Sequence, residues 1–124
     1  MSYHEEQRQP RVYVVQRPAF KNRRTQEWED KFDLSPASEH GSLVYLLPPG
    51  NVSRDLTETM ARLHHRLSDW LPGDHLLACG DPVAIAASVL VAGHYAYGSI
   101  SLLKWDRIDQ GYIPYLIELG ERGH

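Results

Sequence analysis

From residue 43 onward, short apolar runs alternate with helical patterns, and this order restricts the fold more than any other feature. Residues 43–47 and 75–80 are apolar runs of strand length. A stripe of leucine and methionine follows the first run over residues 54–71, and an almost wholly apolar helix follows the second over residues 83–94. With a further strand at residues 99–106, the order strand–helix–strand–helix–strand predicts parallel strands joined by helical crossovers.

The C-terminal part predicts a β-hairpin at the edge of this sheet. Residues 99–106 and 112–119 have strand character, and the turn between them ends in Gly111. Pro114 lacks an N–H, which places the last strand at an edge. A chain of 124 residues with 42% hydrophobic residues suits one domain with a packed core. We therefore predict an α/β fold: a single small domain with a mixed sheet, two main helices and a C-terminal β-hairpin.

Local signals refine this picture. Because residues 43–47 are apolar throughout, we expect them in the interior of a covered sheet. Ser53 is a candidate N-cap of the first helix, which Pro72–Gly73 ends, and Asp81 is the expected N-cap of the second. The second helix, including Ala86, is expected to be buried against the sheet. The alternative is that it buries one face against a partner.

The charge divides the chain into a basic N-terminal part and an acidic remainder. Residues 1–31 carry seven Lys/Arg and five Asp/Glu, whereas residues 32–124 carry six and eleven. Within the first part, residues 11–16 are β-branched and aromatic, which favours a strand, and residues 19–30 are polar, which favours a loop. We predict a basic strand and loop segment over residues 1–31, joined to an α/β core over residues 32–124 in the same domain.

Five basic side chains of the N-terminal segment are the candidate partner-binding residues. With the aromatic residues between them they could contact phosphates or an acidic protein surface. The structural alternative is a solvated, charged edge strand and loop that discourages self-association. The net charge of -3 argues against general coating of nucleic acid. The candidates are Arg11, Arg17, Lys21, Arg23 and Arg24.

Gly80 and Asp81 form the second candidate site, because ligands of open α/β sheets bind at the carboxyl ends of parallel strands. A single glycine is far from a phosphate-binding loop, and the Asp81 carboxylate repels an anion. A metal, sugar or amine would suit this turn better than a phosphate. The structural interpretation is that Asp81 only caps the following helix.

The remaining chemistry-bearing residues predict no catalytic centre. Cys79, the one cysteine, lies in an apolar run, where burial raises a thiol pKa and shields it from reaction. It excludes an internal disulfide. The seven histidines include the neighbours His64 and His65, which diverge on a helix, and no HxxxH or HExxH spacing occurs. We therefore predict no catalytic residue, no metal and no cofactor.

Four short segments resemble a group of short bacteriophage proteins. They are DLSPA at residues 33–37, the strand start at 41–44, GDPVAI at 80–85 and LLKWDR at 102–107. The resemblance spans residues 32–119 and omits the basic segment. It implies a phage-encoded product that acts inside a bacterial cell, and it implies no activity or catalytic residue.

Together these observations lead us to expect a non-enzymatic phage accessory protein. It would bind a host or phage macromolecule in the host cell cytoplasm, for example to modulate a host enzyme or a defence system. A protein partner is the leading expectation, and no apolar run is long enough to span a membrane. One alternative is a nucleic-acid-associated protein that uses the basic N-terminal segment. Another is a small-ligand-binding or hydrolytic domain at the Gly80–Asp81 turn.

Overall fold

A five-stranded mixed sheet with the order β4-β1-β5-β6-β7 forms the centre of the protein. The computed structural model describes residues 8–31 and 33–120, so parts of the predicted segments 1–31 and 32–124 lie outside the described residues. Four strands are parallel and the last is antiparallel to its neighbour, which confirms the predicted fold class and C-terminal hairpin. The strands are β1 (Arg11–Gln16), β4 (Ser42–Leu47), β5 (His75–Leu77), β6 (Ser99–Asp106) and β7 (Gly111–Glu118).

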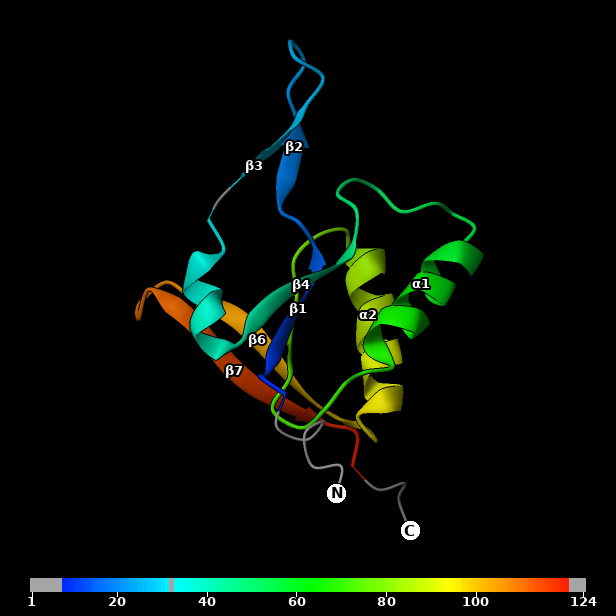
Figure 1. Cartoon of the computed structure of the whole chain (residues 1–124), viewed down its shortest axis with the longest axis vertical. Helices are drawn as coiled ribbons and strands as arrows, with labels where there is room; N and C mark the ends of the chain where they lie inside the picture. The colour runs from blue at the N-terminus through cyan, green and yellow to red at the C-terminus, as the bar shows by residue number, and fades with distance from the viewer. Residues whose placement is uncertain (1–7, 32, 121–124) are drawn as a thin grey trace.

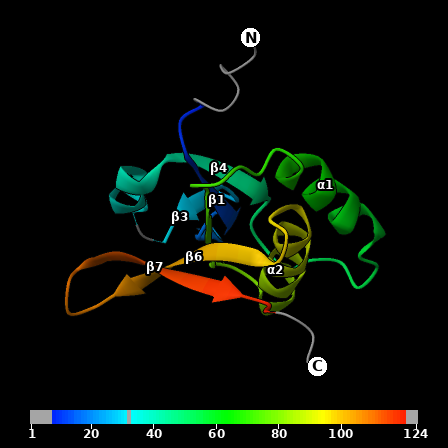
Figure 2. The ribbon, with the colours of Figure 1, turned by 90° about the horizontal axis from the view of Figure 1, so that it is seen from below.

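Helices cover the two faces of the sheet unequally. The helices α1 (Thr57–Leu67) and α2 (Pro82–Tyr95) pack on one face (Figures 1 and 2). Among residues 8–31 and 33–120, the short 3-10 helix η2 (Ser35–His40) is the only helix that packs on the other face. Successive side chains of a strand point to opposite faces, so β1 contributes to both cores. The core on the helix face includes Tyr13 and Val15, and the core on the η2 face includes Val12 and Val14.

The positions of β1 and β4 correct two expectations. β1 lies between β4 and β5 with every residue from Val12 to Gln16 buried, so it is not a solvated edge strand. β4, in contrast, is an edge strand, and Tyr45 is 39% exposed. The apolar sequence of β4 reflects cover on its two faces, because α1 and η2 both contact it. An apolar sequence indicates that both faces of a strand are buried, but it does not indicate whether both of its edges pair with other strands.

Residues 19–30, expected as a loop, form an antiparallel hairpin instead. Its strands are β2 (Ala19–Lys21) and β3 (Trp28–Asp30), which pair only with each other. The hairpin projects from the body of the protein, away from the sheet and the helices (Figure 1). Three-residue strands that bury almost nothing carry no alternation of apolar and polar residues, which is the signal that sequence reasoning needs.

Helix α1 is shorter than predicted at both ends. Its N-cap position is Leu56, which makes no side-chain cap, so Ser53 is not the N-cap. The Ser53 hydroxyl instead accepts from Asp55 N–H in a local turn. At the other end the helix stops at Leu67, before Pro72–Gly73. The intervening turn is held by Asp74, whose carboxylate accepts from Leu71 N–H at 2.8 Å.

Helix α2 begins as predicted, with Asp81 as its N-cap, but only one of its faces is buried. Ala84 and Val91 lie in the core, whereas Leu90 is 71% exposed. Ala86 is also exposed, so its expected place in the core is wrong. An evenly apolar helix gives no sequence signal for the face that meets the sheet, and nothing in the described structure covers the outer face of α2.

Candidate functional site

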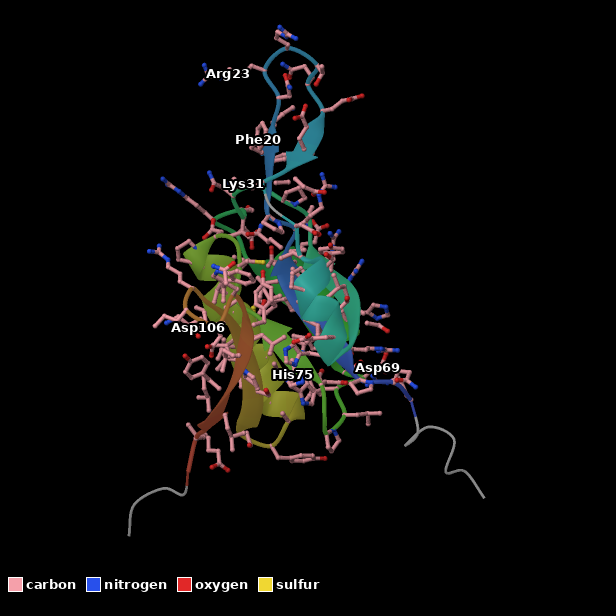
Figure 3. All side chains as sticks on the ribbon, turned by 90° about the vertical axis from the view of Figure 1, so that its left-hand side faces the viewer. Phe20, Arg23, Lys31, Asp69, His75 and Asp106 are labelled. Carbon is pink, nitrogen blue, oxygen red and sulfur yellow. The ribbon has the colours of Figure 1, made fainter. Side chains whose placement is uncertain are left out.

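The five candidate basic residues do not form one cluster. Arg11 begins β1 and Arg17 follows its end, a span of about 20 Å for six extended residues. Arg11 donates to the Tyr13 hydroxyl at 3.0 Å and lies 3.8 Å from Asp69. In Figure 3 Asp69 and Arg23 lie towards opposite ends of the protein. The length of β1 therefore separates Arg11 from the other candidates, which lie at or on the β2–β3 hairpin.

Arg17 serves the base of this hairpin. Its Nε lies 2.9 Å from an oxygen of Asp30, the last residue of β3. One residue further on, Lys31 N–H donates to Pro18 C=O at 2.8 Å. These contacts tie the two ends of the hairpin together and offset the charge of Arg17. Arg17 is thus less available to a partner than the cations further out.

Asn22 organises the turn of the hairpin. Its side-chain oxygen accepts from Arg24 N–H and Thr25 N–H, and its Nδ2 donates to Glu29 at 2.7 Å. Asn22 C=O also accepts from Gln26 N–H, where the left-handed φ of 63° reverses the chain. Asn22 thus makes most of the hydrogen bonds that hold the backbone of the turn, and Gln26 and Thr25 add one each. The side chains of Arg23 and Arg24 are left exposed.

The outer part of the hairpin combines free cations with exposed aromatic rings. Lys21, Arg23 and Arg24 are exposed, and none forms an ion pair with a carboxylate of the described residues. Phe20 is 44% exposed and Trp28 is 41% exposed. Figure 3 shows Arg23 near the tip and Phe20 nearer the body. These five residues, Phe20, Lys21, Arg23, Arg24 and Trp28, are called the hairpin surface below.

The Gly80–Asp81 turn follows β5. The strand order reverses between β1 and β5, because β4 lies on one side of β1 and the later strands lie on the other. In doubly wound sheets the usual ligand site is the crevice at the carboxyl ends of two such strands. Here the buried side chain of Gln16, 3% exposed, fills it. Gln16 Nε2 donates to Pro48 C=O and Gly50 C=O at 2.9 and 2.6 Å, and its Oε1 accepts from Asp81 N–H at 2.6 Å. The Gln16 side chain, at the end of β1, thus links the segments that follow β4 and β5 and occupies the crevice between them.

Gly80 and Asp81 complete this closure. A Cβ on Gly80 would collide with the Gln16 side chain, and the φ of 124° is one that favours glycine. Asp81 Oδ1 accepts from Val83 N–H at 2.8 Å, and Oδ2 accepts from Val52 N–H at 3.3 Å. The N–H and the carboxylate of Asp81 therefore have partners within the chain, which favours the structural interpretation of Asp81. Gln16 was missed by sequence reasoning, although a polar residue that ends a buried strand must find partners.

These contacts predict how Asp81 variants behave. We expect Asp81→Ala to lower the free energy of unfolding by about 1–3 kcal/mol, because it loses the cap and the bond to Val52. Asp81→Asn keeps one acceptor for the cap and should lose about 1 kcal/mol. Urea unfolding of both variants measures this, with the exposed Asp109→Ala as a control expected within about 0.5 kcal/mol of wild type. Wild-type stability of Asp81→Ala would contradict the structural role.

Cys79 lies beyond the end of β5 and is only partly buried. Its thiol donates to Gln16 C=O at 3.0 Å, and its C=O accepts from Gln16 N–H at 3.1 Å. Burial raises the pKa of the Cys79 thiol to about 11, against a smaller lowering effect of the Gln16 backbone. The expected rise of the pKa is confirmed, and the thiol is protonated at neutral pH.

Four of the histidines meet in two pairs. The rings of His40 and His75 are 5.5 Å apart, and those of His64 and His94 are 6.1 Å apart. Burial lowers the pKa of His75, and His40 adds to the effect. In the described residues no group of three or more His, Cys, Asp or Glu side chains could hold a metal ion. Nor does any helix of residues 8–31 and 33–120 have the length and apolar character to cross a membrane.

The fold and its surfaces define a small α/β protein with the sheet order of a doubly wound domain, an antiparallel last strand and an exposed hairpin inserted after β1. A family model described as Phage Pam3 gp32-like protein matches residues 10–119. The chain belongs to this phage protein family. The match begins at residue 10, so the family region includes β1 and the hairpin, which the resemblance over residues 32–119 had omitted. Searches of curated proteins and of solved structures gave no match.

Proposed function

We propose that this phage protein is a non-enzymatic accessory protein that binds a host or phage protein in the host cytoplasm through the hairpin surface. The observation that carries the proposal is that Lys21, Arg23 and Arg24 are exposed on an arm with an ordered turn. Exposed Trp28 is paired with Lys21 across the hairpin, and exposed Phe20 lies on its other face. Arginine and tryptophan are enriched among the residues that dominate binding energy at protein interfaces. An ordered turn also reduces the entropy that binding would otherwise cost.

The charges favour an acidic protein surface over nucleic acid. Glu27 and Glu29 lie on the same hairpin, and residues 32–124 carry five more acidic than basic side chains. A nucleic-acid duplex presents an extended, uniformly negative surface, which this acidic body repels. A protein surface with a local acidic patch can pair with the hairpin cations and also bury Trp28, which lies on the same face of the hairpin as Lys21. The nucleic-acid-associated protein remains the alternative, with the same basic residues.

The test compares two triple variants with the same loss of charge. Lys21→Ser/Arg23→Ser/Arg24→Ser removes the free cations of the hairpin, and Arg54→Ser/Arg62→Ser/Arg107→Ser removes three exposed cations elsewhere. Both sets are exposed, so we expect each melt to stay within about 0.5 kcal/mol of wild type per substitution. Arg17 is kept, because its contact with Asp30 supports the hairpin.

Each form is immobilised and incubated with lysate of phage-infected host cells, with and without nuclease treatment. The captured proteins are identified and then titrated at two salt concentrations. We expect one protein to bind the wild type and the control variant, and the hairpin variant to bind it at least about tenfold more weakly, or ~1.4 kcal/mol. The difference should shrink at high salt. Equal binding by the hairpin variant contradicts the proposal. Capture that depends on nucleic acid and disappears with nuclease supports the alternative.

A further inference from the structure

A cavity of about 770 Å³ opens on the face of the sheet that carries η2. Its floor consists of buried side chains of β5, β6 and β7, namely Leu77, Leu103 and Tyr112. Trp105, 41% exposed, and the partly buried Cys79 form its walls. Small-molecule sites in proteins have volumes of roughly 300–1,000 Å³ and mostly apolar walls. This cavity lies within that range.

The cavity arises because β5 stops early. β5 pairs with β6 only at Leu76↔Leu102 and Leu77↔Leu103, whereas β6 continues to Asp106. After Leu77 the chain turns towards β1, where Cys79 exchanges hydrogen bonds with Gln16. β6 is thus paired only with β7 beyond residue 103, and the space beside it stays open. The short helix η2 is too small to fill it.

Two aromatic rings line the cavity side of the β6–β7 hairpin. The rings of Trp105 and Tyr112 meet edge to face, with centroids 5.1 Å apart. Burial raises the pKa of the Tyr112 hydroxyl, and the negative charge of Asp33 opposes its ionisation further. The phenol therefore stays neutral and offers a hydrogen-bond donor. Aromatic walls of this kind bind flat apolar groups and, through their π faces, organic cations.

The charge at the cavity is negative. Asp33 and Lys104 are the charged residues that line it. Strand alternation directs Lys104 to the face opposite Trp105, and its Nζ lies 5.9 Å from the Tyr115 ring. The Asp33 carboxylate accepts from Ser35 N–H and Ser35 Oγ–H, which lowers its pKa and keeps it ionised. A ligand here meets a carboxylate beside apolar and aromatic walls.

We propose that this cavity binds a small organic cation with a flat apolar body, of which an aromatic amine is the simplest example. The ring would lie against Trp105 and above Leu77 and Leu103, and the ammonium group would pair with Asp33. An anion with the same ring would meet the Asp33 charge without compensation. This inference does not depend on the hairpin surface, because none of the hairpin residues lines the cavity.

The experiment is a calorimetric titration at pH 7 with two probes that share an indole ring, tryptamine and indole-3-propionate. We expect wild type to bind tryptamine at least about tenfold more tightly than indole-3-propionate. Asp33→Asn should reduce that ratio to near one, whereas Asp109→Asn, an exposed carboxylate away from the cavity, should leave it unchanged. Equal affinity of wild type for the two probes, or no binding of either, overturns the proposal.

Two further variants locate the binding. Ala78 lines the cavity, so Ala78→Leu should abolish tryptamine binding by filling the space, and its thermal melt checks that it is folded. Undiminished binding by folded Ala78→Leu would place the ligand elsewhere. The Lys21→Ser/Arg23→Ser/Arg24→Ser variant should bind tryptamine like wild type, so the two proposals fail separately.

Discussion

Ala84→Glu is expected to destabilise the protein by about 4 kcal/mol or more, whereas Ala86→Glu should leave its stability nearly unchanged. Both residues lie on α2, two positions apart, but Ala84 is 0% exposed in the core and Ala86 is exposed. The Ala84 substitution places a carboxylate among apolar side chains that offer it no hydrogen-bond partner. A small domain has only about 5–15 kcal/mol of stability, so this substitution would remove a large part of it.

The two variants form a matched pair, because they introduce the same side chain into the same helix. Thermal melts followed by circular dichroism, with urea unfolding at 25 °C, measure the difference. Equal stability of the two variants would mean that α2 does not pack on the sheet through Ala84. A large loss in Ala86→Glu would mean that the outer face of α2 is covered in solution.

Asp74→Ala is expected to cost about 3–5 kcal/mol, because it leaves a partly buried arginine without its partner. The Asp74 carboxylate is 2% exposed and accepts from both terminal nitrogens of Arg8, at 3.2 and 2.8 Å. It also accepts from Arg11 N–H at 2.9 Å and from Leu71 N–H. One side chain thus joins the start of β1 to the turn before β5.

Asp69→Ala is the control for this effect. Asp69 carries the same charge five residues earlier, but its side chain is 70% exposed and its contact with Arg11 is 3.8 Å long. Exposed pairs of this kind contribute about 0–1 kcal/mol. Urea unfolding of both variants distinguishes a structural carboxylate from a general effect of charge. Similar stability of Asp69→Ala and Asp74→Ala would show that the network around Asp74 does not hold the start of β1.

The sequence was most informative where a pattern repeats. The strand at residues 99–106 was predicted with the bounds of β6, and Asp81 was recognised as the N-cap of α2 because capping chemistry is local. Periodicity located α1, but its ends were wrong. Ser53 bonds to a neighbour in its own turn, and Asp74, 63 residues from Arg11, shapes the segment that follows the helix. Contacts at such separations leave no local signal.

The candidate sites also divide into residues that are close in the sequence and residues that only the fold brings together. Clustering of basic residues drew attention to the segment between Arg11 and Arg24, and most of these residues do lie on one exposed hairpin. Arg11 was grouped with them only because it is close in sequence. Asp33, Trp105 and Tyr112 come from distant parts of the chain, and no spacing relates them. The cavity that they share exists because β5 is five residues shorter than β6.

By itself the sequence determined the class of fold, because the alternation of apolar strands and amphipathic or apolar helices leaves few ways to bury both. It also determined the edge position of the last strand, since Pro114 cannot donate a hydrogen bond. Only the tertiary structure decided that β1 is central, that β4 is an edge, and which face of α2 is buried. Hydrophobicity reports how much surface a segment must bury, and the choice of partner depends on the shape and hydrogen bonding of segments far away in the chain.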